Sequence, residues 1–133
     1  MSKEITQTII TADPGGEQLV QFARELAYEL VDQRLTRSQI RNIFTEARKI
    51  EALWESNSDN ALRRLNMLKP KLAYTYQRNK EKLDMSKLRD TLCWAIDSIN
   101  EAKSPEEKKA RLDRFMDLFE AILAYHHAAG GRN

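Results

Sequence analysis

The chain has 133 residues, of which 41% are hydrophobic and 32% are charged, with only four glycines and three prolines. This composition excludes a disordered or collagen-like chain and is typical of a single helix-rich globular domain. The 22 basic and 20 acidic side chains leave a formal net charge of only +2, so the total charge neither requires nor excludes a nucleic-acid partner.

The N-terminal part of the chain is predicted to form a loose arm and then a helix. Residues 1–16 end in the turn sequence DPGG and are expected to form a flexible arm. In the helix expected over residues 17–33, apolar residues recur at helical spacing, at Leu19, Phe22, Leu26 and Leu30. Residues 17–133 are therefore predicted to form one helical-bundle domain.

The second predicted helix has a complete start signal. Thr36 can cap the helix, and the Gln39 side chain can bond back to it in a capping box. Leu35 and Ile40 occupy the two positions of a hydrophobic staple. The apolar pattern that follows predicts that this helix runs to about Trp54.

The centre of the chain is predicted to hold two short helices that meet at a proline. After a loop over residues 55–60, a short helix is expected over residues 61–69. Pro70 should end or kink this helix, because proline has no N–H and restricts the residue before it. Since proline also suits the first turn of a helix, a second short helix is expected to continue to about Lys82.

Two further helices complete the prediction. Ser86 is expected to cap a helix that runs to about residue 102. The sequence SPEE then supplies Ser104 as a cap, Pro105 at the first helical position and Glu107 as the capping-box partner. This last helix should end at the glycine pair of residues 130–131. Because no alternating strand pattern occurs, the predicted fold is an all-α compact bundle of about five or six helices.

Basic residues gather on the predicted helix that starts at Thr36 and on the segment around Pro70, away from the apolar faces. Few acids lie among them, and none occurs between Arg63 and Lys80. Uncompensated guanidinium groups favour an external anion, above all phosphate. An aromatic residue among them favours nucleic acid, with base stacking; ordinary solvated surface charge is the alternative for each residue alone. The candidate nucleic-acid-binding residues are Arg37, Arg41, Arg48, Lys69, Lys71, Tyr74 and Arg78.

No pattern of residues indicates catalysis. His126 and His127 are adjacent and would point about 100° apart on a helix, so a buried His126 and a surface His127 are expected rather than a metal site. Cys93 lies in an apolar helix, which favours core packing over reactivity. A Gly-rich phosphate loop, a Ser/His/Asp pattern and a paired-carboxylate motif are all missing from the sequence. We therefore expect no enzyme activity, no catalytic or metal-binding residue and no cofactor.

The cellular compartment is predicted from what the sequence lacks. A single cysteine cannot form an internal disulfide bond, which favours a reducing compartment. No apolar run is long enough to span a membrane, and the start MSKEITQTII lacks the order of a signal peptide. A cytoplasmic protein is therefore expected, with no membrane partner.

Three blocks of sequence, LTRSQIRNIF, LKPKLAYTYQR and FMDLFEAILAYH, together resemble the small subunit of type III-A CRISPR effector (Csm) complexes. The resemblance covers roughly residues 35–127 and implies a non-catalytic helical bundle that stacks along a ribonucleoprotein filament in antiviral defence. The implied partners are CRISPR RNA, target RNA, further copies of the chain, and the backbone and large subunits. Tyr76 departs from the relatives, which often have a small residue there. The family's basic motif residues, which would contact the RNA backbone without sequence specificity, correspond to Arg37, Arg41, Lys69, Lys71 and Arg78.

Two other functions remain open at this point. LTRSQIRNIF also resembles the recognition helix of a helix-turn-helix DNA-binding regulator, although the preceding VDQRL lacks the glycine that such turns often use. The other alternative is a protein–protein adaptor whose surface charge is incidental.

Overall fold

The computed structural model describes residues 2–131, and this part of the chain forms six α-helices and no strand. The predicted all-α fold is therefore confirmed. In chain order the helices are α1 Ser2–Ala12, α2 Glu17–Asp32, α3 Arg37–Trp54, α4 Ser58–Asn79, α5 Ser86–Asn100 and α6 Pro105–Ala128.

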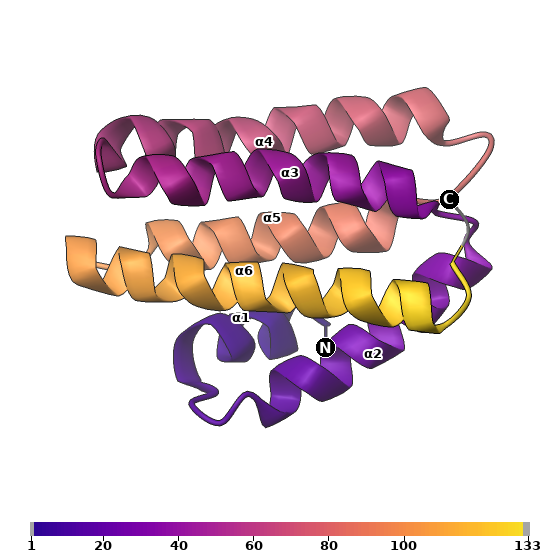
Figure 1. The fold of residues 1–133 in the computed structure, drawn as a ribbon, viewed down its shortest axis with the longest axis horizontal. Helices are drawn as coiled ribbons and strands as arrows, with labels where there is room; N and C mark the ends of the chain where they lie inside the picture. Colours follow the sequence, from indigo (N-terminus) through magenta and orange to yellow (C-terminus); the bar gives the residue numbers. More distant parts are fainter. Residues whose placement is uncertain (1, 132–133) are drawn as a thin grey trace.

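Helices α3 to α6 form a four-membered ring, in which α3 and α5 each contact both α4 and α6. Helices α1 and α2 cover the side of this ring that α5 and α6 form (Figure 1). Edge-to-face aromatic contacts join Phe119 to Phe115, at 6.1 Å between ring centroids, and to Phe44 on α3, at 5.2 Å. Among the described helices α4 contacts only α3 and α5, which leaves its outer side open.

Residues 2–12 form α1 where a loose arm was predicted. Three side chains of this helix, Thr6, Ile9 and Ile10, are fully buried, and the helix packs against α5 and α6. The local sequence does not predict this helix, because its many β-branched residues have low helix propensity. Tertiary burial of the two isoleucines, which removes their apolar surface from water, stabilises α1 instead.

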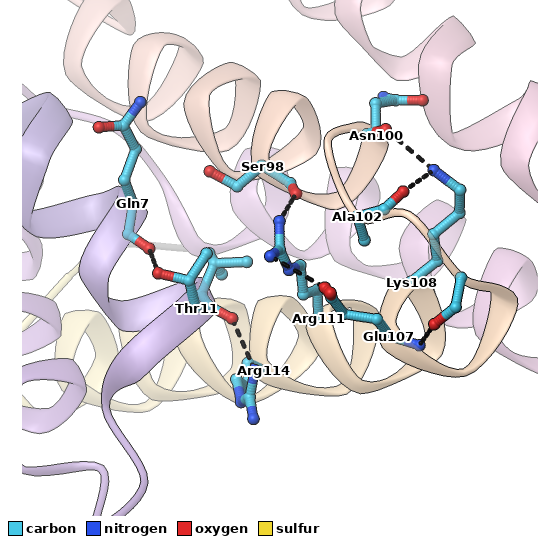
Figure 2. A network of polar contacts seen from close by, with 11 residues as sticks. Gln7, Thr11, Ser98, Asn100, Ala102, Glu107, Lys108, Arg111 and Arg114 are labelled. Atoms are coloured by element: carbon cyan, nitrogen blue, oxygen red, sulfur yellow. Dashed lines mark hydrogen bonds and ion pairs between the residues drawn. The ribbon is translucent and has the colours of Figure 1, made fainter.

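Three basic side chains of α6 bind the carbonyl ends of neighbouring helices (Figure 2). Arg114 donates to the Ile10 carbonyl at 2.9 Å, near the end of α1, and Arg111 donates to the Ser98 carbonyl at 2.6 Å, near the end of α5. Lys108 donates to the carbonyls of Asn100 and Ala102 at 2.9 and 2.8 Å. The last carbonyls of a helix lack partners within the helix, so these cations both satisfy and anchor the two ends.

The predicted starts of α3 and α6 are confirmed, with one difference. Thr36 accepts a hydrogen bond from the Gln39 backbone, and the Gln39 side chain accepts one from the Thr36 backbone, so the capping box is complete. Ser104 likewise caps α6 by accepting from the Glu107 N–H at 3.0 Å. The Glu107 carboxylate, however, pairs with Arg111 at 3.2 Å, so it does not return the second bond of a box.

The prediction of Ser86 as a helix cap is wrong by position. Met85 occupies the cap of α5, and Ser86 is the first helical residue. The Ser86 N–H donates instead to an oxygen of Asp84 at 2.8 Å. The Asp84 carboxylate therefore accepts a backbone N–H at the start of α5, the role that was expected of the Ser86 hydroxyl.

Pro70 neither ends nor divides a helix, in contrast to the prediction. Helix α4 runs without interruption from Ser58 to Asn79, with Pro70 inside it. Its inward face holds Ala61, Leu65, Leu68 and Leu72, which are all buried on both sides of the proline. Burial of this continuous apolar stripe offsets the missing N–H and the steric cost of the proline ring.

The end of α6 is held by a buried histidine. His126 is fully buried, and its Nε2 atom donates to the Leu35 carbonyl at 2.6 Å, so Nε2 carries a proton. Gly130 has a left-handed backbone with φ of 89°. Gly131 then lies so close to the imidazole that a Cβ atom at this position would be 2.1 Å from a ring carbon, so only glycine fits.

We expect Pro70→Ala to stabilise the protein while leaving its helix content unchanged. The substitution restores an N–H in the middle of α4, and it also gives the unfolded chain more freedom, so the net gain should be about 1–3 kcal/mol. Urea unfolding followed by circular dichroism measures this gain. Gln77→Ala, at another exposed position of α4, is the control and should change stability by less than about 0.5 kcal/mol. A destabilised Pro70→Ala variant would contradict the expectation.

Stability should fall as the pH drops below neutrality. Burial holds the pKa of His126 below its ordinary value, and the charges of Arg37 and His127 act in the same direction, against the hydrogen bond to Leu35. The unfolded chain therefore takes up the proton first, so stability present above about pH 6.5 is lost as the pH falls toward the folded pKa, by up to about 1.4 kcal/mol per pH unit.

Urea unfolding between pH 5 and pH 8 tests this dependence on the buried imidazole. His126→Gln can still donate to the Leu35 carbonyl but cannot titrate, so its stability should vary less with pH than that of the wild type. His127→Gln, at an exposed position, should keep most of the dependence. Equal pH profiles for the wild type and His126→Gln would contradict the assignment.

Candidate nucleic-acid interface

The basic stripe of α3 lies on the side of that helix that faces α6. Arg48 forms ion pairs with Glu51 at 2.8 Å and with Glu120 of α6 at 2.7 Å. Its guanidinium also lies over the Phe44 ring, 4.9 Å from the centroid. The hydrogen bond with Glu51 raises the pKa of Arg48, and the neighbouring Glu120 adds to this effect. Arg48 is thus neutralised within the fold.

The two other arginines of this stripe differ in their surroundings. Arg37 is half-buried, and one of its terminal nitrogens contacts Nδ1 of His127. Arg41 is exposed and, within residues 2–131, has no hydrogen-bond or ion-pair partner. Of the three candidate residues on α3, Arg41 is therefore the one whose charge is available to a ligand.

The two lysines beside Pro70 lie on opposite flanks of α4. Lys69 pairs with Asp97 of α5 at 2.5 Å, and this hydrogen bond raises the pKa of Lys69. Lys71 faces α3, where its nearest acid is Glu46 at 4.0 Å. Because residues two positions apart on a helix point about 160° apart, a single surface cannot use both lysines. Of these two candidate lysines, the fold therefore places only Lys71 on the side of α4 that faces α3.

Tyr74 and Arg78 lie on the same edge of α4 as Lys71. The Tyr74 side chain is 68% exposed, the most exposed large hydrophobic residue of the described chain, and Arg78 is also exposed. Tyr76, in contrast, packs partly against the core and lies under the Arg89 guanidinium, 4.2 Å from the ring centroid. The two tyrosines therefore have different surroundings, and only Tyr74 is open to a ligand.

A groove between α3 and α4 brings the candidate Lys71 together with two basic residues that were not predicted from the sequence, Lys49 and Arg64, and with the acid Glu46. Its volume is about 460 Å³, and its lining includes Lys49 of α3 with Arg64, Met67 and Lys71 of α4. A signal was present in the sequence, because Arg64 precedes Lys71 by seven residues, which is close to two helical turns. Because the predicted helix break at Pro70 put Arg64 and Lys71 on different helices, this spacing did not indicate a shared edge.

Another pocket lies on the other side of the molecule. Its volume is about 320 Å³, and α1, α2 and α5 line it with apolar residues such as Phe22 and Trp94 and with the acids Glu25, Glu29 and Asp90. One base, Lys87, also lines this pocket and pairs with Glu29, so the lining is acidic on balance, whereas bases outnumber acids in the α3–α4 groove. A ligand with phosphate groups is expected at the basic groove and not here.

The described residues show little else that could hold a ligand. Residues 2–131 contain no group of three or more histidine, cysteine, aspartate or glutamate side chains placed to hold a metal ion. In the same range no helix combines the length and the apolar character that crossing a membrane requires. Cys93 is half-buried, and burial raises the pKa of its thiol, which lowers its reactivity.

Comparison with known proteins identifies the family. Residues 13–132 match the family model described as Csm2 Type III-A, a range that starts after α1 and includes both basic helices. No curated protein and no solved structure is significantly similar to the chain. Since the matched range covers most of the sequence, the chain belongs to the Csm2 Type III-A family, a family of small subunits of type III-A CRISPR Csm complexes.

Proposed function

We propose that this small subunit binds the sugar–phosphate backbone of RNA in a cytoplasmic type III-A effector that serves antiviral defence. The RNA is the CRISPR RNA, the target RNA or the duplex that they form, and copies of the subunit stack along the filament beside the backbone and large subunits. The observation that carries the proposal is the set of exposed cations on α3 and α4 that lack close acidic partners. The sequence-predicted candidates in this set are Arg41 and Arg78, which have no acidic partner within residues 2–131, and Lys71, whose nearest acid is Glu46 at 4.0 Å.

The chemistry of these cations supports binding without sequence readout. Lysine and arginine attract phosphate oxygens, and such contacts position a protein on nucleic acid but carry no base information. Arg48 and Lys69 contribute less in this proposal, because Glu120 and Asp97 already neutralise them. A subunit that must follow any guide sequence needs this kind of contact.

A helix-turn-helix regulator is less well supported. Its recognition helix would have to present its first turn to a DNA groove. Arg37, the first residue of α3, is instead directed at His127 of α6, and α3 is flanked by both α4 and α6. The family match also favours the effector subunit.

We expect the double variant Arg41→Ala, Lys71→Ala to bind RNA more weakly and with a smaller dependence on salt. Each lost phosphate contact should reduce the slope of log affinity against log salt by about 0.7 for a single strand and about 0.9 for a B-form DNA duplex. The loss should be similar for unrelated sequences, because the contacts are to the backbone. Fluorescence anisotropy in a salt titration measures both quantities.

A matched variant sharpens this test. Lys69→Ala removes the same kind of charge from the same helix, but from a lysine that Asp97 already pairs, so it should change the salt slope much less. Melting temperatures should hardly move for the double variant, since both residues are exposed. Unchanged RNA binding in the double variant would leave these cations as ordinary surface charge. A strong preference for one DNA sequence would favour the regulator.

We also expect the isolated subunit to lack nuclease and nucleotide-hydrolysing activity. No catalytic constellation was found in the sequence, so incubation with RNA, DNA or ATP, with and without divalent metal, should leave each substrate intact. Activity that follows the protein through a second purification would contradict this expectation.

A further inference from the structure

The outer edge of α4 carries a regular series of exposed side chains. Basic and apolar residues alternate along it at spacings of three and four, within an arc of about 80° and over about 21 Å of helix. We call this series the α4 track. Its members are Arg64, Met67, Lys71, Tyr74 and Arg78.

The two apolar members of the α4 track are unusually exposed. Met67 is 53% and Tyr74 is 68% exposed, whereas the other large hydrophobic residues with high exposure lie on α1 and α2. Exposing such side chains to water is unfavourable, and single exposed residues are common. Here the two lie one helical heptad apart among three cations, which is a pattern and not a scattered pair.

Few carboxylates lie close enough to pair with the three cations of the α4 track. The Lys71 side chain is 61% exposed, and its nearest carboxylate, that of Glu46, is 4.0 Å away. Within residues 2–131, Arg64 and Arg78 have no hydrogen-bond or ion-pair partner. The track is therefore an open line of positive charge.

The flank of the α4 track that faces α3 is hollow, and polar residues, Glu46 among them, lie there beside a mostly apolar lining. Arg64, Met67 and Lys71 line the groove shared with α3, together with Asn60. A second hollow of about 210 Å³ continues past Lys71 to Thr75. Amide and hydroxyl groups there can exchange hydrogen bonds with sugars and bases.

The alternation of cations with Met67 and Tyr74 matches unpaired nucleotides better than a duplex. A duplex presents phosphates and sugars on its outside and keeps its bases stacked inside, so it would leave an exposed tyrosine without a role. A single strand offers a phosphate and a free base face in each nucleotide, and aromatic side chains stack on such faces.

We infer that the α4 track binds a single-stranded stretch of RNA, with phosphates at Arg64, Lys71 and Arg78 and an unpaired base stacked on Tyr74. This inference rests on the proposed function and deepens it, because it names the state of the RNA and adds Arg64 and Met67 to the site. The π-face of any base suffices for stacking, so the contact remains independent of sequence.

Two other occupants fit the α4 track less well. A second copy of α4 packed along the same edge would place arginines and lysines against each other, which is repulsive at this spacing. An acidic amphipathic helix of another protein would match the charges. It would not need a planar aromatic ring at the Tyr74 position, and this difference can be tested.

The experiment compares two probes that share a backbone but differ in bases. Anisotropy measures binding of a short oligouridine RNA and of an abasic strand of equal length and charge. The wild type should bind oligouridine more tightly than the abasic strand. Tyr74→Ala should weaken oligouridine binding about 5- to 150-fold, the range expected for one stacked base. It should not change abasic binding or the salt slope, and Tyr74→Phe should restore the affinity.

The controls separate stacking from charge and from folding. Tyr28→Ala removes a 49% exposed tyrosine from α2 and should not change binding. Arg64→Gln should lower the salt slope for both probes by about 0.7. Because Tyr74 is exposed, the Tyr74→Ala variant should keep the melting temperature of the wild type.

The outcomes also separate this inference from the proposed function. Salt-dependent RNA binding that Tyr74→Ala leaves unchanged, or weakens equally for both probes, would overturn the stacking site and leave backbone binding in place. If Tyr74→Ala weakens binding of a glutamate-rich helical peptide but not of RNA, the α4 track belongs to a protein partner. Absence of any RNA binding by the wild type would overturn both proposals.

Discussion

The bundle depends on the hydrogen bonds between the cations of α6 and the carbonyl ends of α1 and α5. Lys108, Arg111 and Arg114 each donate to such a carbonyl, and a charged donor contributes about 1.5–3 kcal/mol per bond. Burying a helix end without partners would be costly. These bonds hold α1 and α5 in register against α6, so residues 2–12, whose local helix propensity is low, can dock onto the ring and complete the core.

The same type of residue therefore has three different roles in one small domain. The cations of α6 at the helix ends are structural, and Arg48 and Lys69 are neutralised by acids of neighbouring helices. Arg41, Lys71 and Arg78 remain exposed without a close acidic partner. A net charge of +2 conceals this division, because attraction of a polyanion depends on where the unpaired charges lie and not on their sum.

Local sequence signals predicted the parts of the fold that local interactions determine. The capping residues Thr36 and Ser104 mark the starts of α3 and α6, because a cap is a contact between residues three apart. The prediction failed where distant packing outweighs local preference, as in α1 and at Pro70. The second failure also affected the site, because a division of α4 at Pro70 obscures the fact that Arg64 and Lys71 share one edge of a single helix.

The two flanks of α4 explain why the fold leaves one line of charge open. Toward α5, Lys69 meets Asp97, and Asn66 exchanges hydrogen bonds with Asn100, so this flank is closed by polar partners from the neighbouring helix. Toward α3, Glu46 is the acid that lies near Lys71, at the limit of an ion pair. Both flanks carry cations, and both lie beside the buried apolar face of α4. Among the described helices only α3 and α5 contact α4. The cations on its α3 flank therefore have fewer acidic partners than those on its α5 flank and are more open to an anionic ligand.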